Sequence, residues 1–205
     1  MEQKGSNAET KRLNKIKIAK FIYHHGEASK QEIAAALHLS MPTVLQRVKE
    51  LIQEGVVTEA GEYESTGGRK AKALSVVAGS RYAVGLDITG NHVSFVLLDA
   101  GGTVCGKKRV RCAFEDTEEY YVSLGEMLGF FLDKYQVDRE RLLGVGVSIP
   151  GIVDEEMKRM PQSHVLRVEN FELDKISCRI PFRTWFRNDA NSAAYAELRG
   201  SRRDT

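Results

Sequence analysis

Asp189 is the residue whose surroundings indicate chemistry most directly. It lies in the run Arg187-Asn188-Asp189-Ala190-Asn191, about forty residues beyond the glycine-rich stretch 144–154. An Asp that follows a strand and opens a helix is suited to a sugar-binding cleft, because its carboxylate accepts hydrogen bonds from hydroxyl groups. The same position is suited to a structural role, since Asn188 and Asp189 would cap a helix that starts near Ala190. The two roles are compatible, and the residues alone leave both open.

A second group of side chains that could do chemistry lies on a helix near residue 40. Ser40 is placed to cap this helix, whose second position is Pro42. Four apolar residues fall on one face and should be buried: Val44, Val48, Leu51 and Ile52. The opposite and N-terminal surface carries hydroxyl, amide and guanidinium groups, which bond to base edges and phosphates. We predict DNA contacts from this surface: Ser40, Met41, Thr43, Gln46 and Arg47.

Two preceding helices should position that surface. Apolar residues at broadly helical spacing between Leu13 and Ile22 predict a first helix, which Gly26 ends. The run Ser29-Lys-Gln-Glu32 is a capping-box pattern and predicts a short second helix through Leu37, followed by a turn at residues 38–39. Three helices in this order predict a helix-turn-helix, in which the second helix of the motif enters the major groove.

A basic hairpin should follow these helices. Residues 56–59 and 74–77 read as strands around the tip Ser65-Thr-Gly-Gly-Arg-Lys70. Two glycines let the backbone approach DNA closely, and an adjacent Arg suits the negative potential of a narrow minor groove. We predict that Arg69 enters the minor groove and that Lys70 and Lys72 contact phosphates. The alternative is a small interaction domain with a flexible tip.

Composition limits the classes of protein to consider. The chain has 205 residues, 42% of them apolar, and a formal net charge of +2, so it is not a polycation that coats nucleic acid indiscriminately. Lys and Arg outnumber Asp and Glu by 12 to 9 through residue 80, against 18 to 19 beyond it. No apolar run reaches the roughly 18 residues of a membrane span, and the polar opening is unlike a signal peptide. Three cysteines without metal-type spacing predict unpaired thiols in the cytoplasm and no metal site: Cys105, Cys112 and Cys178.

The remainder of the chain reads as an α/β body. Residues 82–87, 92–98 and 104–111 are three strand-like runs separated by glycine-bearing turns. A helix is predicted from about Thr117 to Lys134, and the apolar run 142–149 is a buried strand. We therefore expect a disordered segment over 1–10, a winged helix-turn-helix over 11–78 and an α/β body over 81–205.

Several of these pieces are similar to the ROK family, named for repressors, open reading frames and kinases. They are Gly85-Leu-Asp-Ile-Thr-Gly-Asn-His92, the stretch Gly144 to Asp154 and Asn188-Asp-Ala-Asn191, together with the winged head. The resemblance covers residues 11 to about 200 and is to the N-acetylglucosamine and xylose repressor type. It implies a body with the first lobe of an actin/hexokinase-like (ribonuclease H-like) fold. It also implies that Asn188 and Asp189 bond sugar hydroxyls and that Pro150-Gly151 lines the cleft.

The turn after Asp87 departs from the pattern of the family's kinases. Those kinases have a Gly-Gly-Thr-Lys type of turn there, whose amides cradle ATP phosphates, whereas this chain has Thr89-Gly90-Asn91-His92. A β-carbon close to the phosphates argues against phosphoryl transfer. We therefore expect a regulator and not an enzyme. The alternative that stays open is a sugar kinase with Asp189 as the base, or a non-functional remnant.

The resemblance also implies partners. A regulator of this type would bind double-stranded operator DNA as a homodimer, respond to a sugar or sugar phosphate that weakens DNA binding, need no cofactor and have no membrane contact. The family's second lobe should begin soon after Leu198, so we expect this sequence to represent a family member that is shortened after its first lobe.

Overall fold

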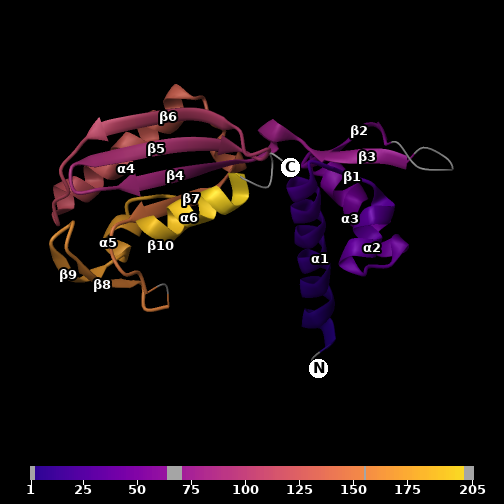
Figure 1. Ribbon diagram of the computed structural model, residues 1–205, viewed down its shortest axis with the longest axis horizontal. Helices are drawn as coiled ribbons and strands as arrows, with labels where there is room; N and C mark the ends of the chain where they lie inside the picture. Colours follow the sequence, from indigo (N-terminus) through magenta and orange to yellow (C-terminus); the bar gives the residue numbers. More distant parts are fainter. Residues whose placement is uncertain (1–2, 64–70, 155, 201–205) are drawn as a thin grey trace. The chain divides into compact units, whose positions relative to one another are not determined.

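The computed structural model describes residues 3–63, 71–154 and 156–200. It divides into two compact units, Met1–Ser80 (unit 1) and Arg81–Thr205 (unit 2), drawn as ribbons in Figure 1. Among the described residues, no helix has both the length and the hydropathy that a membrane crossing requires.

Unit 1 consists of three helices and a small antiparallel sheet. The helices are α1 (Gln3–His25), α2 (Lys30–Leu37) and α3 (Met41–Gln53). The strands are β1 (Glu27–Ala28), β2 (Val57–Tyr63) and β3 (Ala71–Val76), and β3 pairs with both of the others. A three-helix core followed by a two-stranded hairpin is the winged helix-turn-helix arrangement expected from the sequence.

Local signals explain where these helices begin and end. Gly26 follows α1 with a φ of +75°, a conformation that favours glycine. The capping box of α2 is complete, because the amide of Glu32 donates to Ser29 Oγ at 3.2 Å and the amide of Ser29 donates to Glu32 Oε2 at 2.7 Å. The helices bury one apolar cluster: Ile18, Ile22, Ile33, Val44, Val48, Leu51 and Leu74.

Three sequence expectations for unit 1 need correction. Residues 3–10 belong to α1, where disorder was expected through residue 10, because extending a helix that already has a buried segment costs little. Ser40 occupies the N-cap position of α3 but makes no side-chain cap bond. Ile52 is 37% exposed, so it lies at the margin of the buried face. The short strand β1 had no sequence signal. Of the predicted hairpin tip, residues 65–70 lie outside the described residues.

Unit 2 is a five-stranded mixed sheet with helices on both faces. The sheet order is β10-β7-β4-β5-β6. Its strands are β4 (Tyr82–Ile88), β5 (His92–Asp99), β6 (Val104–Arg111), β7 (Leu142–Ile149) and β10 (Thr184–Asn188). The hairpin β8 (Arg159–Ser163) and β9 (Val168–Glu172) lies outside this sheet. The helices are α4 (Glu118–Lys134), α5 (Asp174–Ser177) and α6 (Asp189–Gly200), with 3-10 turns at Ala78–Ser80 in unit 1 and Arg139–Arg141 in unit 2.

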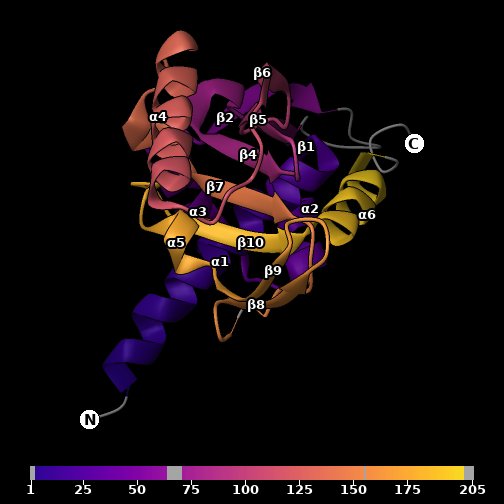
Figure 2. The ribbon, with the colours of Figure 1, turned by 90° about the vertical axis from the view of Figure 1, so that its left-hand side faces the viewer.

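The two faces of this sheet differ in what covers them. Alternating residues of β4, β5 and β7 point to the α4 side and are fully buried with Leu124, Leu128 and Phe131 of that helix. Figures 1 and 2 show α4 on one side of the sheet and α6 on the other. Strands β4, β7 and β10 run parallel, so their carboxyl ends meet at one edge of the sheet. At this edge β10 ends at Asn188 and α6 begins at Asp189, a place that we call the Asp189 junction.

Most of the expected elements of unit 2 are confirmed. Strands β4 to β7 and helix α4, with Thr117 as its N-cap, match the sequence interpretation to within a residue or two. The hairpin of β8 and β9 was not predicted from the sequence.

Candidate functional site

The predicted DNA contacts on helix α3 differ in how far they are exposed. Met41 and Gln46 are exposed, Thr43 is partly exposed, and Thr43 Oγ1 lies 2.9 Å from Ser40 Oγ at the start of the helix. Arg47 was expected on the outward surface with them. Its side chain is instead only 14% exposed, because it lies on the flank of α3 between the buried face and Gln46.

Glu50 holds two of these side chains. Its Oε1 accepts a hydrogen bond from Gln46 Nε2 at 3.2 Å, and its Oε2 forms an ion pair with Arg47 Nη1 at 2.8 Å. The spacings of four and three residues place all three side chains on one side of the helix. Hydroxyl, amide and guanidinium groups therefore lie close together at the exposed start of α3, with the guanidinium neutralised.

The wing carries an ionic cluster at its base. Glu59 Oε2 accepts from Lys72 Nζ at 2.7 Å, and Oε1 accepts from Lys30 Nζ at 3.2 Å. These bonds, with Lys72 the stronger influence, hold the pKa of Glu59 below its ordinary value. Lys72, predicted as a phosphate contact, is thus joined to an acidic partner in the DNA-free protein. Arg69 and Lys70 lie outside the described residues and remain predictions.

Sequence reasoning did not identify a groove between α1 and the start of α3. It has a volume of about 380 Å³ and is lined by residues of both helices, all of them polar except Pro42: Asn7, Thr10, Lys11, Asn14, Pro42, Thr43, Gln46 and Arg47. The signal was present, since these α1 residues recur at i, i+3, i+4 and i+7, which is one helical face. The groove adds amide, hydroxyl and ammonium donors beside the predicted contacts.

In unit 2, the Asp189 junction is held together by Asn188. The Nδ2 of Asn188 donates to the carbonyl of Gly151 at 2.7 Å, and its Oδ1 accepts from the amide of Asn191 at 3.2 Å. Asn188 therefore caps α6 and joins the end of β10 to the turn after β7. Asp189 is exposed, and its Oδ1 accepts from the amide of Ala190 at 2.9 Å. The helix-capping role is confirmed for Asn188, and sugar contact by either residue remains a prediction.

A buried serine supports the Pro150-Gly151 turn from the other side. Ser163, 3% exposed, donates to the carbonyl of Pro150 and accepts from the amide of Leu166 at 3.1 Å. Gly151 has a φ of +154°, and a β-carbon there would overlap the Sδ of Met160. The structure thus brings Pro150, Gly151, Asn188 and Asp189 together at the carboxyl ends of β7 and β10.

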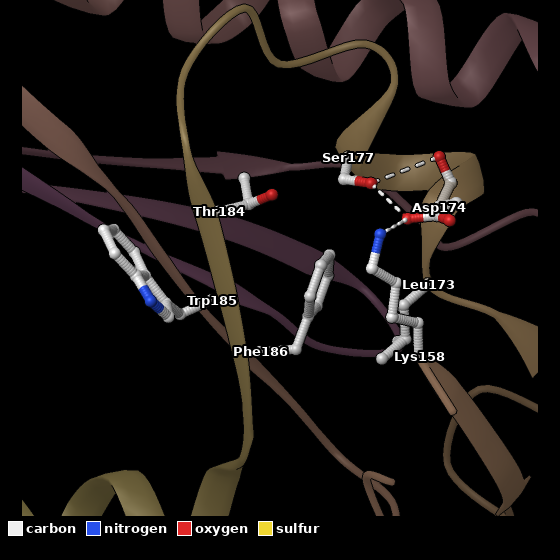
Figure 3. Close-up of a pocket in the computed structure, with 7 residues that line it drawn as sticks. All are labelled: Lys158, Leu173, Asp174, Ser177, Thr184, Trp185 and Phe186. Atoms are coloured by element: carbon white, nitrogen blue, oxygen red, sulfur yellow. Dashed lines mark hydrogen bonds and ion pairs between the residues drawn. The ribbon is translucent and has the colours of Figure 1, made fainter. Parts of the chain in front are cut away.

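A polar cavity of about 350 Å³ adjoins this junction, within the range of small-molecule sites. Ile152, Val153, Arg187, Asn188 and Asn191 line it. A second cavity of about 150 Å³, shown in Figure 3, lies at the opposite end of β10 beside α5. There Lys158 Nζ reaches Asp174 Oδ1 at 3.3 Å, so the groups at its rim already bond to each other. The described residues contain no cluster of side chains that could hold a metal ion.

The turn that would cradle phosphates in a kinase is closed on itself. The amide of Thr89 donates to the carbonyl of His92 at 2.9 Å, and the amide of His92 donates to Thr89 Oγ1 at 3.1 Å. The hydroxyl of Thr89 also donates to the carbonyl of His92 at 3.0 Å. The amides of Thr89 and His92 are therefore engaged within the β4–β5 hairpin.

The two units define a winged helix-turn-helix protein with an α/β body. A ROK family model matches residues 83–205, and a winged helix-turn-helix DNA-binding model matches residues 12–58. The chain belongs to the ROK family.

Among its relatives, the xylose repressor of Bacillus spizizenii is 25% identical over 189 residues, which are 91% of this chain and 49% of that protein. The DNA-binding transcriptional dual regulator NagC of Escherichia coli is 24% identical over 196 residues, 95% of this chain and 48% of NagC. A solved structure of a ROK family transcriptional regulator, a homolog of the E. coli MLC protein, has a TM-score of 0.73 and 21% identity. The structural match covers 92% of this chain and 48% of the solved chain, and it confirms the expected fold. The chain spans about half the length of the curated relatives it matches.

Proposed function

We propose that this chain is a DNA-binding repressor of carbohydrate-metabolism genes and has no kinase activity. The observation that carries the proposal is the exposed start of α3, where Thr43 and Gln46 lie at the surface of a helix-turn-helix with a shared apolar core. In this motif the N-terminal residues of the second helix reach base edges in the major groove. The names of the relatives support the proposal, since one is a xylose repressor and another is a DNA-binding transcriptional dual regulator.

The proposed DNA surface combines base-reading and phosphate-binding groups. Thr43 and Gln46 would read base edges, with Ser40 and Met41 at the groove wall. Lys70 and Lys72 would contact phosphates and Arg69 the minor groove. For Lys72, binding DNA requires exchanging Glu59 for a phosphate, a step favoured by the release of counterions from DNA.

The experiment is a selection of duplexes from a randomised library by the full chain, followed by gel shift at two salt concentrations. Sequence-specific binding that weakens steeply with salt is expected. A homodimer predicts a selected sequence with two inverted half-sites separated by about one helical turn or a multiple of it. Recovery of no preferred sequence would contradict the proposed function, and a single half-site bound by one chain would contradict the dimer.

We further propose that the effector is a sugar bound beside the Asp189 junction. The cavity there has the polar lining that hydroxyl groups need, including Asn188, and the residue that follows Asn188 in the chain, Asp189, is exposed. Xylose and N-acetylglucosamine are suitable first probes, because relatives carry these sugars in their names. Binding should raise the melting temperature of the full chain, and Asp189→Asn should abolish that rise. A rise that persists in the variant would exclude Asp189 as the contact.

The absence of kinase activity rests on the closed β4–β5 turn. Because the amides of Thr89 and His92 bond within the hairpin, these two donors are withdrawn from any phosphoryl group that the turn would otherwise stabilise. The full chain should therefore show no sugar-dependent ATP hydrolysis. Turnover that disappears in Asp189→Ala would establish a kinase instead.

A further inference from the structure

Glu50 is unusual among the described acidic residues of unit 1, because it binds two predicted DNA contacts at once. Each of its carboxylate oxygens has one donor, Gln46 Nε2 on Oε1 and Arg47 Nη1 on Oε2. The side chains of Arg47 and Glu50 are only 14% and 26% exposed. The pair is therefore better shielded from water and salt than an ordinary surface ion pair.

The carboxylate has two separable effects on these neighbours. It restricts the rotamers of Gln46, so that less conformational entropy is lost when the amide docks against a base edge. It also neutralises Arg47 and keeps the guanidinium from reaching a phosphate. The first effect favours sequence-specific binding, and the second disfavours binding to DNA of any sequence, which is dominated by phosphate contacts.

We propose that Glu50 is a positioning residue that sets the sequence specificity of the DNA surface, by ordering Gln46 and withholding Arg47 from phosphates. The proposal rests on the proposed DNA-binding function. In this proposal Arg47 has a structural role as the ion-pair partner of Glu50, whereas Gln46 contacts the bases.

The test compares two duplexes, one selected by the wild-type chain from a randomised library and one with the same bases shuffled. Glu50→Ala should reduce the ratio of the two affinities about tenfold, mainly by tightening binding to the shuffled duplex. The freed Arg47 should also steepen the salt dependence on the shuffled duplex, by about 0.9 in the slope of log K against log salt. Glu50→Gln keeps one acceptor oxygen and should give an intermediate ratio.

Glu54→Gln is the matched control. Glu54 follows the last residue of α3, and its Oε1 forms an ion pair with Lys15 Nζ at 2.7 Å. The variant removes the same charge one turn further along, so it should change both affinities alike and leave their ratio unchanged. Equal loss of both affinities in Glu50→Ala and Glu50→Gln would overturn the proposal, because it would reduce Glu50 to a structural role. Failure of the wild-type chain to prefer any duplex is a different result, which would overturn the proposed function itself.

Discussion

The start of α3 in unit 1 and the Asp189 junction in unit 2 carry similar polar side chains, but these side chains bond to different kinds of partner. On α3, the side chains of Gln46 and Glu50 bond to other side chains at the surface. At the junction, Asn188 and Ser163 bond to backbone atoms of segments 37 and 13 residues away. Groups on α3 can therefore exchange their partners for a ligand at little cost to the fold, whereas those at the junction are part of the fold.

The largest expected effect is a loss of unfolding free energy when the buried hydrogen bonds of Ser163 are removed. Ser163→Ala removes a donor to the Pro150 carbonyl and an acceptor for the Leu166 amide, both inside unit 2. Leaving two buried backbone groups without partners should cost about 3 kcal/mol of unfolding free energy. The single tryptophan, Trp185, lies in unit 2, so its fluorescence during denaturation measures this loss. Ser177→Ala is the control, and an equal effect of both substitutions would refute the bridging role.

Asn188 should show a smaller effect of the same kind. Asn188→Ala loses the cap of α6 and the bond to Gly151, together about 2 kcal/mol. Asn188→Asp keeps an oxygen for the cap and loses only the donor, so it should fall between the alanine variant and the wild type. The same fluorescence transition gives the answer. An unchanged unfolding free energy in both variants would show that Asn188 does not stabilise the fold and would restrict its role to contact with a ligand.

Gln46→Ala should affect binding without affecting stability. Losing an amide that reads a base edge should weaken binding to the selected duplex by about 1.4 kcal/mol, a factor of ten. Because Gln46 is exposed, the melting temperature should not move. Gln53→Ala, at the exposed end of α3, should leave the affinity as it is. Reduced stability with unchanged affinity would place Gln46 with the structural side chains.

The smallest expected effect concerns pH and the base of the wing. The pKa of Glu59 is lowered in the folded protein, chiefly by Lys72 and then by Lys30. A lowered pKa adds stability above the ordinary pKa of Glu, and this stability is lost as pH falls through the lowered value. Glu59→Gln should thus destabilise unit 1 by about 0.5 kcal/mol at neutral pH and by nothing in acid. Amide exchange in β3 would measure it, and a pH-independent difference would exclude the ionic origin.

Elements with local signals were predictable from the sequence. Helix α2 follows from the Ser29–Glu32 capping box, α4 from Thr117 and its apolar face, and β7 from an uninterrupted apolar run. The β8–β9 hairpin was missed, because its strands are five residues each and lack a continuous buried face, although the two strands pair with each other. A strand before Asp189 was expected, but its bounds were not predicted. The position of β10 depends on pairing with β7, which lies much earlier in the chain than a sequence window reaches.

The residue types of the sites were predictable, but their bonding was not. The sequence placed Asn188 and Gly151 near one cleft, yet the bond between them depends on the register of β10 beside β7. Likewise Arg47 was expected to point outward, and its ion pair with Glu50 depends on rotamers that helical spacing permits but does not select. Spacing defines which side chains are neighbours, and packing decides which of them bond.

Hydrogen–deuterium exchange of the full chain, with and without the selected duplex, tests the central claim most directly, because it follows both regions in one experiment. DNA bound through α3 should slow exchange across Met41–Gln53, above all in its first turn, where the amides lack helical partners. Exchange at the Asp189 junction, residues 184–194, should stay unchanged. Slowed exchange at the junction with no change in α3 would contradict the account.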